Sequence, residues 1–344
     1  MSTVLSRLGW DDGWSAAAAM AGAGDVSQVR PGRVARTDRG RCRVWTADGL
    51  TTAALAPTVR AAPTTGDWTL LRRDGLITAV LPRRTAVVRG AGRRDARAQV
   101  LAANVDVLFV VAALSEGPNL RRIERMLSVA WESGAVPVVL LTKADLSRDP
   151  AAEAAEVGRI APGVKVMAVS PRDGSGLDAV RAALPAGRTG ALIGPSGTGK
   201  STLVNALVGS EALPTRALRD DGKGRHTSAS RDLVLLPWGA VLIDTPGLRG
   251  VQLWHAAGFN QAFSDVGALA AQCRFTDCRH DGEPGCAVAA AVADGLLPPR
   301  RLASYDKLNR EQSWLAGRYD ARLRAEQRRI WKLHSLQARS RSAR

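Results

Sequence analysis

The feature that most constrains this chain is the segment GPSGTGKST at residues 194–202, which fits the pattern G-x-x-x-x-G-K-[ST]. An apolar segment precedes it at residues 189–194, and a helical pattern follows over residues 200–209. Glycines let such a loop wrap closely around phosphate oxygens, and the N–H groups at the start of the helix point at the negative charge. We therefore predict a phosphate-binding loop in which Lys200 contacts the β- and γ-phosphates and Ser201 binds Mg²⁺.

Strand and helix patterns alternate from about residue 100, which predicts a mostly parallel, doubly wound sheet. Ligands collect at the carboxyl ends of the strands in such sheets. The chain has no L-S-G-G-Q-like signature of a transporter ATPase. The expected strands are residues 105–114, 135–141, 164–170, 189–194, 232–237 and 240–245.

Two segments after the phosphate loop have the character of nucleotide switches. DTPG begins at Asp244, at the end of an expected strand, so that Asp244 can hold Mg²⁺ through water and the Gly247 amide can contact a γ-phosphate. The Gly-rich, polar segment at residues 221–230 lies between the phosphate loop and DTPG. We expect Thr227 in this segment to complete the Mg²⁺ shell, with Ser228 as the alternative.

The segment TKAD, at residues 142–145, has the K-x-D pattern with which proteins read guanine. It directly follows the buried strand expected at residues 135–141. Asp145 can accept hydrogen bonds from guanine N1–H and the 2-amino group, a pair that adenine does not offer. A second segment, AVSPRDGSG at residues 168–176, also ends a strand, and its Ser170 region has the character of a loop that contacts guanine O6.

These segments occur in the order base, base, phosphate, switch, switch, whereas an ordinary GTPase has the phosphate and switch segments first. Each one lies at the carboxyl end of an expected strand, so moving the chain termini leaves the site intact if the old ends lie close together. The order therefore predicts a circularly permuted GTPase domain.

Short strands broken by turns fill residues 30–90, in the segments GRVART, RCRVWTA, LTTAAL, DWTLLR, LITAVLP and TAVVRG. This pattern predicts a small OB-like β-barrel, with a generic β-sandwich or barrel as the alternative. The net charge is +16, and residues 25–90 and 259–344 carry most of the excess. Basic segments around a nearly balanced middle indicate a polyanionic partner, RNA or DNA.

The segment CRFTDCRHDGEPGC contains Cys273, Cys278, His280 and Cys286. Three thiolates and one imidazole can form a closed tetrahedral shell for one structural Zn²⁺. Free cysteines are the alternative, but three of the four cysteines of the chain fall in this short segment together with a histidine. The fourth, Cys42, belongs to the expected barrel and is interpreted as a core or surface thiol.

The combination of barrel, permuted GTPase segments and Cys/His cluster resembles the circularly permuted GTPases of the RsgA family, which mature the small ribosomal subunit. The resemblance covers nearly the whole chain. It implies binding of GTP and GDP, one Zn²⁺, Mg²⁺ with GTP, and contact with the small ribosomal subunit and its rRNA, which stimulates hydrolysis. The predicted GTP-binding residues are Thr142, Lys143, Ala144, Asp145, Ser170, Gly194, Pro195, Ser196, Gly197, Thr198, Gly199, Lys200, Ser201, Thr202 and Gly247.

The resemblance also assigns a catalytic role to His226, because Leu248 follows DTPG where many GTPases have a water-orienting Gln. One position departs from the family, which usually has Asn where Thr142 stands. A hydroxyl must then replace the amide that ties the base loop to the phosphate loop. We expect this change to affect nucleotide affinity more than guanine selectivity, since Asp145 remains.

The expected organisation is an N-terminal extension (1–24), an OB-like RNA-binding barrel (25–90), a permuted GTPase domain (91–258) and a zinc-binding domain with a basic helical tail (259–344). No apolar stretch approaches the ~20 residues of a membrane span, so we expect a cytoplasmic protein without membrane contact, and a monomer. Two other functions are open: an RNA-binding assembly module in which the nucleotide is structural, and a metabolic P-loop kinase.

Overall fold

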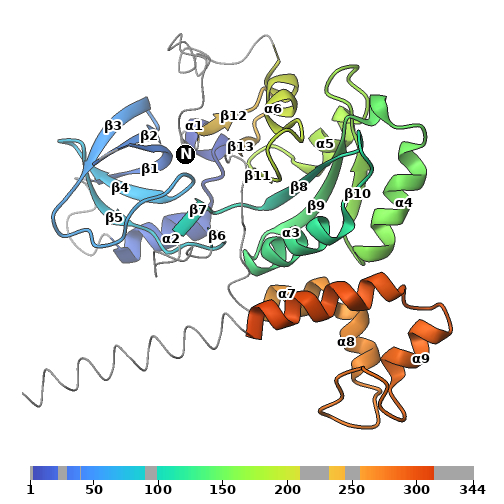
Figure 1. Cartoon of the computed structure of the whole chain (residues 1–344). Helices are drawn as coiled ribbons and strands as arrows, with labels where there is room; N and C mark the ends of the chain where they lie inside the picture. The colour runs from blue at the N-terminus through green and yellow to red at the C-terminus, as the bar shows by residue number, and fades with distance from the viewer. Residues whose placement is uncertain are drawn as a thin grey trace, which may run out of the picture. The chain divides into compact units, whose positions relative to one another are not determined.

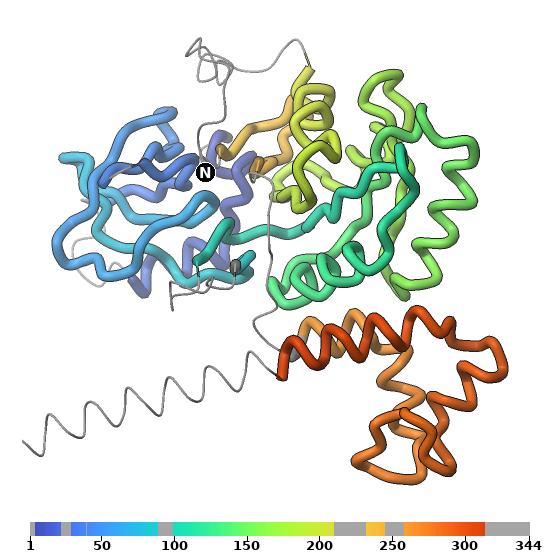
Figure 2. The backbone as a smooth tube through the Cα atoms, in the orientation of Figure 1, coloured from blue at the N-terminus to red at the C-terminus, as the bar shows by residue number. Residues whose placement is uncertain are grey.

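The structure is a computed structural model in which two compact units are recognised. The first comprises residues 1–253 and 257–264, and the second comprises residues 254–256 and 265–344. Figure 1 shows the secondary structure of both units, and Figure 2 follows the chain through them. The structure describes residues 3–21, 29–38, 40–89, 99–209, 232–244 and 256–313.

The barrel of the first unit is closed by five strand pairs, in the order β1-β2-β3-β5-β4. The β3–β5 pair is parallel, and the other four pairs are antiparallel. Residues on alternate positions point inward, and the apolar core contains Val34, Cys42, Val44, Leu71 and Ile77. The expected OB-like barrel is thus confirmed. Its strands are β1 (Val29–Asp38), β2 (Arg41–Thr46), β3 (Gly49–Leu55), β4 (Trp68–Arg72) and β5 (Leu76–Val80).

The last short strand expected in the barrel lies outside it. This strand, β6 (Ala86–Arg89), pairs antiparallel with β7 (Gln99–Ala103) in a separate two-stranded sheet. The five-stranded barrel is already closed, so it has no free edge to which a sixth strand could add. The β6–β7 pair instead occupies the stretch of chain between the barrel and the parallel sheet (Figure 1).

Two helices precede the barrel, α1 (Thr3–Arg7) and α2 (Asp12–Ala21), and the sequence did not indicate them. The loop between them places Trp10 edge-on against Trp68 of the barrel, with ring centroids 4.8 Å apart. Trp14 of α2 is also buried, with its ring centroid 6.1 Å from that of Trp68. These N-terminal helices therefore cover an outer face of the barrel.

Arg33 of β1 lies under this cover and is 1% exposed. Its guanidinium donates to the Leu8 carbonyl, to the Gly66 carbonyl at 3.3 Å and to the Asn104 carbonyl at 3.0 Å. It lies 5.2 Å from the ring centroid of Trp68. Burial lowers the pKa of Arg33 to about 10. One buried cation therefore joins the N-terminal helices, the barrel and the chain that enters the parallel sheet.

The six-stranded sheet of the first unit has the order β10-β9-β8-β11-β13-β12. All neighbouring pairs are parallel except β12 and β13, which are antiparallel. This agrees with the predicted mostly parallel, doubly wound sheet. The strands are β8 (Val107–Ala113), β9 (Val136–Thr142), β10 (Lys165–Ala168), β11 (Thr189–Ile193), β12 (Asp232–Leu235) and β13 (Val241–Asp244).

Helices cover both faces of this sheet. On one face, Val180 of α5, Leu184 just after α5 and Leu203 of α6 share a buried apolar cluster with Phe109 and Leu140 of the strands. On the other face, α3 contacts β8 and β9, and α4 contacts β10 (Figure 1). These helices are α3 (Leu120–Glu132), α4 (Pro150–Ile160), α5 (Leu177–Ala183) and α6 (Lys200–Val208). A further helix, α7 (Ala256–Ala262), packs closely against α3 at Gly258.

The second unit is helical and small. It contains most of α8 (Ser264–Ala270), then α9 (Ala287–Ala293) and a helix described over residues 299–313. Arg301, 1% exposed, makes a two-pronged ion pair with Asp265 at 2.8 and 3.0 Å. The core of the second unit contains the buried side chains of Val266, Val288, Ala291, Leu297 and Leu308. No helix in the described part of either unit is long and apolar enough to span a membrane.

Candidate nucleotide site and metal centre

The predicted phosphate loop connects β11 to α6. Gly194 packs so closely against β8 that an added Cβ would lie 2.5 Å from the Val111 carbonyl oxygen. Gly199 caps α6 with φ 81°, a left-handed conformation that glycine adopts without strain. These positions explain why the loop needs glycine there, and its backbone can approach a phosphate group closely.

The Lys200 side chain folds back over this loop. Its Nζ donates to the Gly194 carbonyl at 2.9 Å and to the Pro195 carbonyl at 2.5 Å. Burial lowers the pKa of Lys200, and the negative charge of Asp244 on β13 acts in the opposite direction. A buried ammonium that is held by neutral carbonyls is well suited to exchange them for phosphate oxygens, which carry charge.

The predicted Mg²⁺ ligands are only partly described. Ser201 is exposed at the start of α6, and Asp244 ends β13, the parallel neighbour of β11. Both lie at the carboxyl edge of the sheet, and a hydroxyl with a carboxylate suits Mg²⁺, which prefers oxygen ligands. Thr227, Gly247 and the predicted catalytic His226 lie outside the described residues.

Thr142, the residue that departs from the family pattern, ends β9 and is fully buried. Its hydroxyl lies 2.6 Å from the Thr198 carbonyl of the phosphate loop and 3.1 Å from the Ala112 carbonyl of β8. One hydroxyl carries one proton, so the shorter contact is the better hydrogen bond. The TKAD segment is therefore joined to the phosphate loop by a side-chain hydroxyl, as the sequence required.

The rest of TKAD forms a tight turn. Lys143 has a left-handed backbone (φ 59°), and a short 3₁₀ turn, η2 (Ala144–Leu146), follows. The buried hydroxyl of Ser170 donates to Asp145 Oδ1 at 2.8 Å, while Asp145 itself is exposed. Ser170 thus orients the carboxylate that we predict to read guanine, a contact that the sequence did not reveal.

A pocket of about 600 Å³ lies beside these loops. Lys143 and residues 195–198 form one side of it, and the end of β8, the loop after it and the first turns of α3 form the other. No sequence pattern indicated this second side, because its residues fit no nucleotide-binding motif. The residues on that side are Ala112, Ala113, Ser115, Glu116, Gly117, Pro118, Asn119, Arg122, Ile123 and Met126.

The predicted metal ligands Cys273, Cys278, His280 and Cys286 come together in the second unit. One ligand atom from each lies within 4.8 Å of all the others. His280 Nδ1 is 3.7 Å from Cys273 Sγ and 3.5 Å from Cys286 Sγ. Three sulfurs and one imidazole nitrogen at this spacing can enclose one metal ion, and this set of donors suits Zn²⁺.

The backbone around the cluster supports it. Cys286 caps α9, and its Sγ accepts a hydrogen bond from the Ala289 amide at 3.3 Å. The Glu283 carboxylate accepts hydrogen bonds from the Arg279 and Asp281 amides, each at 2.8 Å.

The fourth cysteine lies in the first unit. Cys42 is a buried core thiol of the barrel, and burial raises its pKa to about 11. The two thiol environments therefore differ, as expected.

Comparison with known proteins finds relatives along nearly the whole chain. The chain is 50% identical over 342 residues to a protein of Streptomyces coelicolor named small ribosomal subunit biogenesis GTPase RsgA. The aligned region covers 96% of this chain and 92% of that protein. It is 45% identical over 353 residues to a protein of the same name from Opitutus terrae, with 96% and 95% coverage.

Two solved structures share the fold. YjeQ from Thermotoga maritima has a TM-score of 0.62 at 23% identity, covering 83% of this chain and 98% of that one. YloQ, a circularly permuted GTPase, has a TM-score of 0.60 at 22% identity, with 83% and 95% coverage. The model of the RsgA GTPase family matches residues 80–254. The chain therefore belongs to the RsgA GTPase family.

Proposed function

We propose that this protein binds the small ribosomal subunit and couples GTP hydrolysis to a late step in the maturation of that subunit. The observation that carries the proposal is the contact between the Thr142 hydroxyl and the phosphate loop, in a permuted chain 50% identical to a small ribosomal subunit biogenesis GTPase. That contact brings the guanine-reading and phosphate-binding segments to one edge of one sheet.

In this proposal, different residues of the first unit bind the base, the phosphates and the Mg²⁺ ion of GTP. Asp145, oriented by Ser170, accepts from guanine N1–H and the 2-amino group. Lys200 contacts the β- and γ-phosphates, and the phosphate-loop amides surround them. Ser201 and Asp244, with Thr227, would hold Mg²⁺, which neutralises phosphate charge when bound.

Hydrolysis also requires an ordered water molecule at the γ-phosphate. Leu248 cannot hydrogen-bond to water, so we assign this task to His226, which a partner must bring into position. Slow hydrolysis by the protein alone, and faster hydrolysis on the small subunit, follow from this assignment. The proposed Zn²⁺ has a structural role, because the Cys273, Cys278, His280 and Cys286 cluster leaves no ligand position open.

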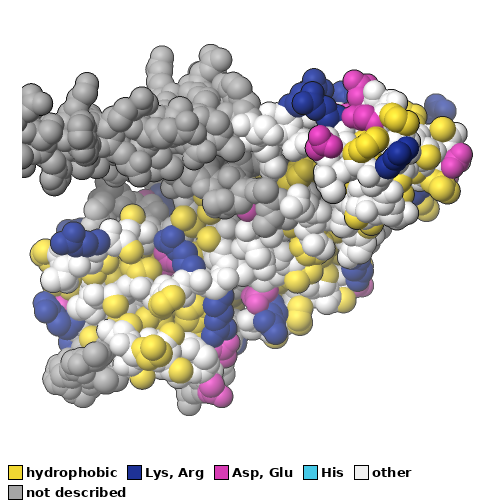
Figure 3. Space-filling model, turned by 90° about the horizontal axis from the view of Figure 1, so that it is seen from below, with side chains coloured by type: hydrophobic (Ala, Val, Ile, Leu, Met, Phe, Trp, Pro, Cys, Tyr) yellow, Lys and Arg dark blue, Asp and Glu magenta, His cyan; other side chains and the backbone are white. Residues whose placement is uncertain are grey.

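Binding to rRNA follows from the charge of the chain, which is +16. On the face drawn in Figure 3, the described Lys and Arg side chains lie in separate groups, several of them beside Asp or Glu. We therefore propose that several small basic groups among the described residues take part in holding the RNA. Affinity should fall as the salt concentration rises.

The direct test is GTP hydrolysis by the purified protein alone, with small ribosomal subunits, and with large subunits as a control. The proposal expects slow hydrolysis alone, stimulation of about tenfold or more by small subunits, and no stimulation by large subunits. Negligible hydrolysis that small subunits leave unchanged would contradict it, and would favour an RNA-binding assembly module in which the nucleotide is structural.

A further inference from the structure

One aromatic side chain of the second unit is exposed. Among the described residues, five large hydrophobic side chains are exposed, and Phe275, at 42%, is the aromatic one. A single exposed apolar residue is ordinary on a protein surface and needs no explanation by itself. Two features of the surroundings of Phe275, a fixed backbone and a neighbouring arginine, indicate a binding role.

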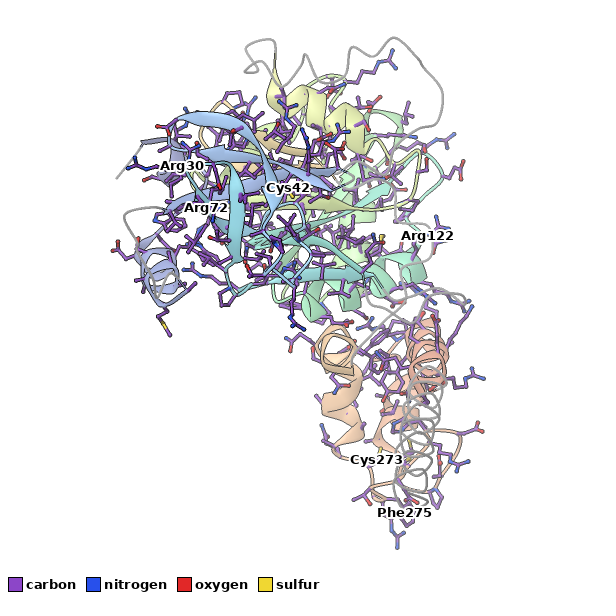
Figure 4. All side chains as sticks on the ribbon, turned by 90° about the vertical axis from the view of Figure 1, so that its left-hand side faces the viewer. Arg30, Cys42, Arg72, Arg122, Cys273 and Phe275 are labelled. Atoms are coloured by element: carbon purple, nitrogen blue, oxygen red, sulfur yellow. The ribbon has the colours of Figure 1, made fainter. Side chains whose placement is uncertain are left out.

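The backbone on both sides of Phe275 is fixed. Phe275 lies between the metal ligands Cys273 and Cys278, and the Cys278 amide donates to the Phe275 carbonyl at 3.3 Å. The neighbouring Arg274 amide donates to the Gly285 carbonyl at 3.1 Å. Figure 4 shows Phe275 at the outer end of this loop, beyond Cys273. The ring is therefore presented on a stiff loop and loses little backbone freedom when a partner binds it.

A guanidinium accompanies the ring. Arg274 is exposed, and its Cζ lies 5.5 Å from the centroid of the Phe275 ring. The Arg274 stem lies against Gly285, where an added Cβ would come within 3.0 Å of Arg274 Cβ. Gly285 also has φ 77°, so glycine both allows the turn and leaves room for the arginine. Phe275 and Arg274 thus form one exposed aromatic and cationic surface, which we name the zinc-loop platform.

The charges around the zinc-loop platform decide what it can bind. Arg274 and Arg279 share the loop with Asp277, Asp281 and Glu283, so the loop has no positive excess. A phosphate group would meet carboxylates as well as guanidinium groups there, whereas a nucleobase needs a flat, weakly charged surface. Aromatic rings stack on unpaired bases with little regard to sequence, and an arginine adds a cation–π contribution.

We propose that the zinc-loop platform stacks on one unpaired base of the RNA to which this protein binds. The inference rests on the proposed function for the identity of the RNA, and it adds a residue-level contact within the second unit. Because stacking displaces few counterions, the contact should contribute to affinity without contributing to its salt dependence.

The test compares the full-length protein with Phe275→Leu, which keeps an apolar side chain, and Phe275→Trp, which keeps an aromatic ring. Leu296→Ala is the matched control, since Leu296 is 78% exposed in the same unit. Affinity for small ribosomal subunits is measured with a non-hydrolysable GTP analogue at several salt concentrations. Zinc content verifies that each variant keeps its loop.

We expect Phe275→Leu to weaken binding about tenfold, from the loss of one base–aromatic stack. Phe275→Trp should bind like the wild type, and so should Leu296→Ala. The slope of log affinity against log salt should be the same for all four proteins, whereas loss of a phosphate contact would reduce it by about one. If Phe275→Leu and the wild type bind small subunits equally well, the platform does not contact the subunit and the proposal is wrong. If Phe275→Leu reduces the salt slope, the lost contact is to a phosphate and not a stacked base.

Binding to polyuridine RNA, measured on the same proteins, shows whether the ring contacts RNA or a protein of the subunit. If Phe275→Leu weakens binding to subunits but not to polyuridine, the ring contacts a protein and the RNA platform is wrong. If the wild type fails to bind subunits, the proposed function fails, and the platform is then judged on polyuridine alone. There, Phe275→Leu must still bind more weakly than Phe275→Trp.

Discussion

The two units each contain an arginine that lies over an aromatic ring, at almost the same distance. Arg33 lies 5.2 Å from the ring centroid of Trp68 in the first unit, and Arg274 lies 5.5 Å from that of Phe275 in the second. The first pair is 1% and 0% exposed, whereas Phe275 is 42% exposed. The same local geometry is therefore found in a core in the first unit and on a surface in the second. The first unit has two further pairs, Arg84 over Trp14 and Arg181 over Trp238, whose arginines are about half exposed and paired with Asp11 and Asp178.

The hydrogen bonds of the two arginines explain the difference. The Arg33 guanidinium donates to the carbonyls of Leu8, Gly66 and Asn104, which belong to three separate segments of the first unit. Arg274 is instead exposed, in the loop that carries the predicted metal ligands. An arginine over a ring thus stabilises the fold where its donors are used within the protein, and is free for recognition where it faces solvent.

Replacing the two rings should separate these roles most strongly. Trp68→Ala removes a buried indole that contacts Trp10, Trp14 and Arg33, so we expect it to lower the free energy of unfolding by about 3–5 kcal/mol. Phe275→Ala should change it by less than about 0.5 kcal/mol. Urea unfolding followed by circular dichroism measures both. Similar losses for the two variants would remove the distinction.

Replacing the two arginines by methionine should give a smaller difference in the free energy of unfolding. Arg33→Met leaves the carbonyls of Leu8, Gly66 and Asn104 without this donor, and we expect a loss of about 1–3 kcal/mol. Arg274→Met should lie within about 0.5 kcal/mol of the wild type. The same unfolding experiment applies. A stabilised Arg33→Met protein would mean that the cost of burying the cation exceeds the value of its three hydrogen bonds.

A further buried contact sharpens the comparison, because it belongs to the proposed nucleotide site. Thr142→Val keeps the shape of the side chain but removes the hydroxyl that reaches the Thr198 carbonyl at 2.6 Å. We expect GTP to bind about 5- to 20-fold more weakly, which corresponds to ~1–2 kcal/mol for one buried hydrogen bond. Thr142→Ser is the control and should bind nearly as well as the wild type. Calorimetric titration with GTP and GDP measures the effect, and unchanged affinity in Thr142→Val would contradict it.

Sequence patterns predicted the parts of the molecule in which neighbouring residues act together. The glycines and Lys200 of the phosphate loop, the TKAD segment and the Cys/His cluster are each contained in a short stretch, so their chemistry can be read locally. The alternation of strands and helices likewise predicted the parallel sheet, because each strand is a continuous apolar run.

Contacts between distant segments could not be predicted in this way. The burial of Arg33 depends on Leu8 and Asn104, which lie far from it in the chain, so its sequence neighbours suggest only an ordinary strand arginine. The pairing of β6 with β7 depends on closure of the barrel, which no local pattern encodes. Ser170 illustrates the same limit, since its contact with Asp145 crosses between two strand ends.

We propose that the first unit binds the nucleotide while the loop that carries the predicted zinc ligands of the second unit contacts RNA. Cys278→Ser tests it most directly, because it removes one of the four metal ligands and touches no residue of the nucleotide site. The measurement is affinity for a non-hydrolysable GTP analogue and, separately, for small ribosomal subunits, on protein whose zinc content is known. We predict loss of the metal, GTP-analogue affinity within about twofold of the wild type, and subunit affinity lower by about tenfold or more. Zinc-free protein that binds subunits as tightly as the wild type, or that loses nucleotide affinity together with subunit affinity, would contradict the claim.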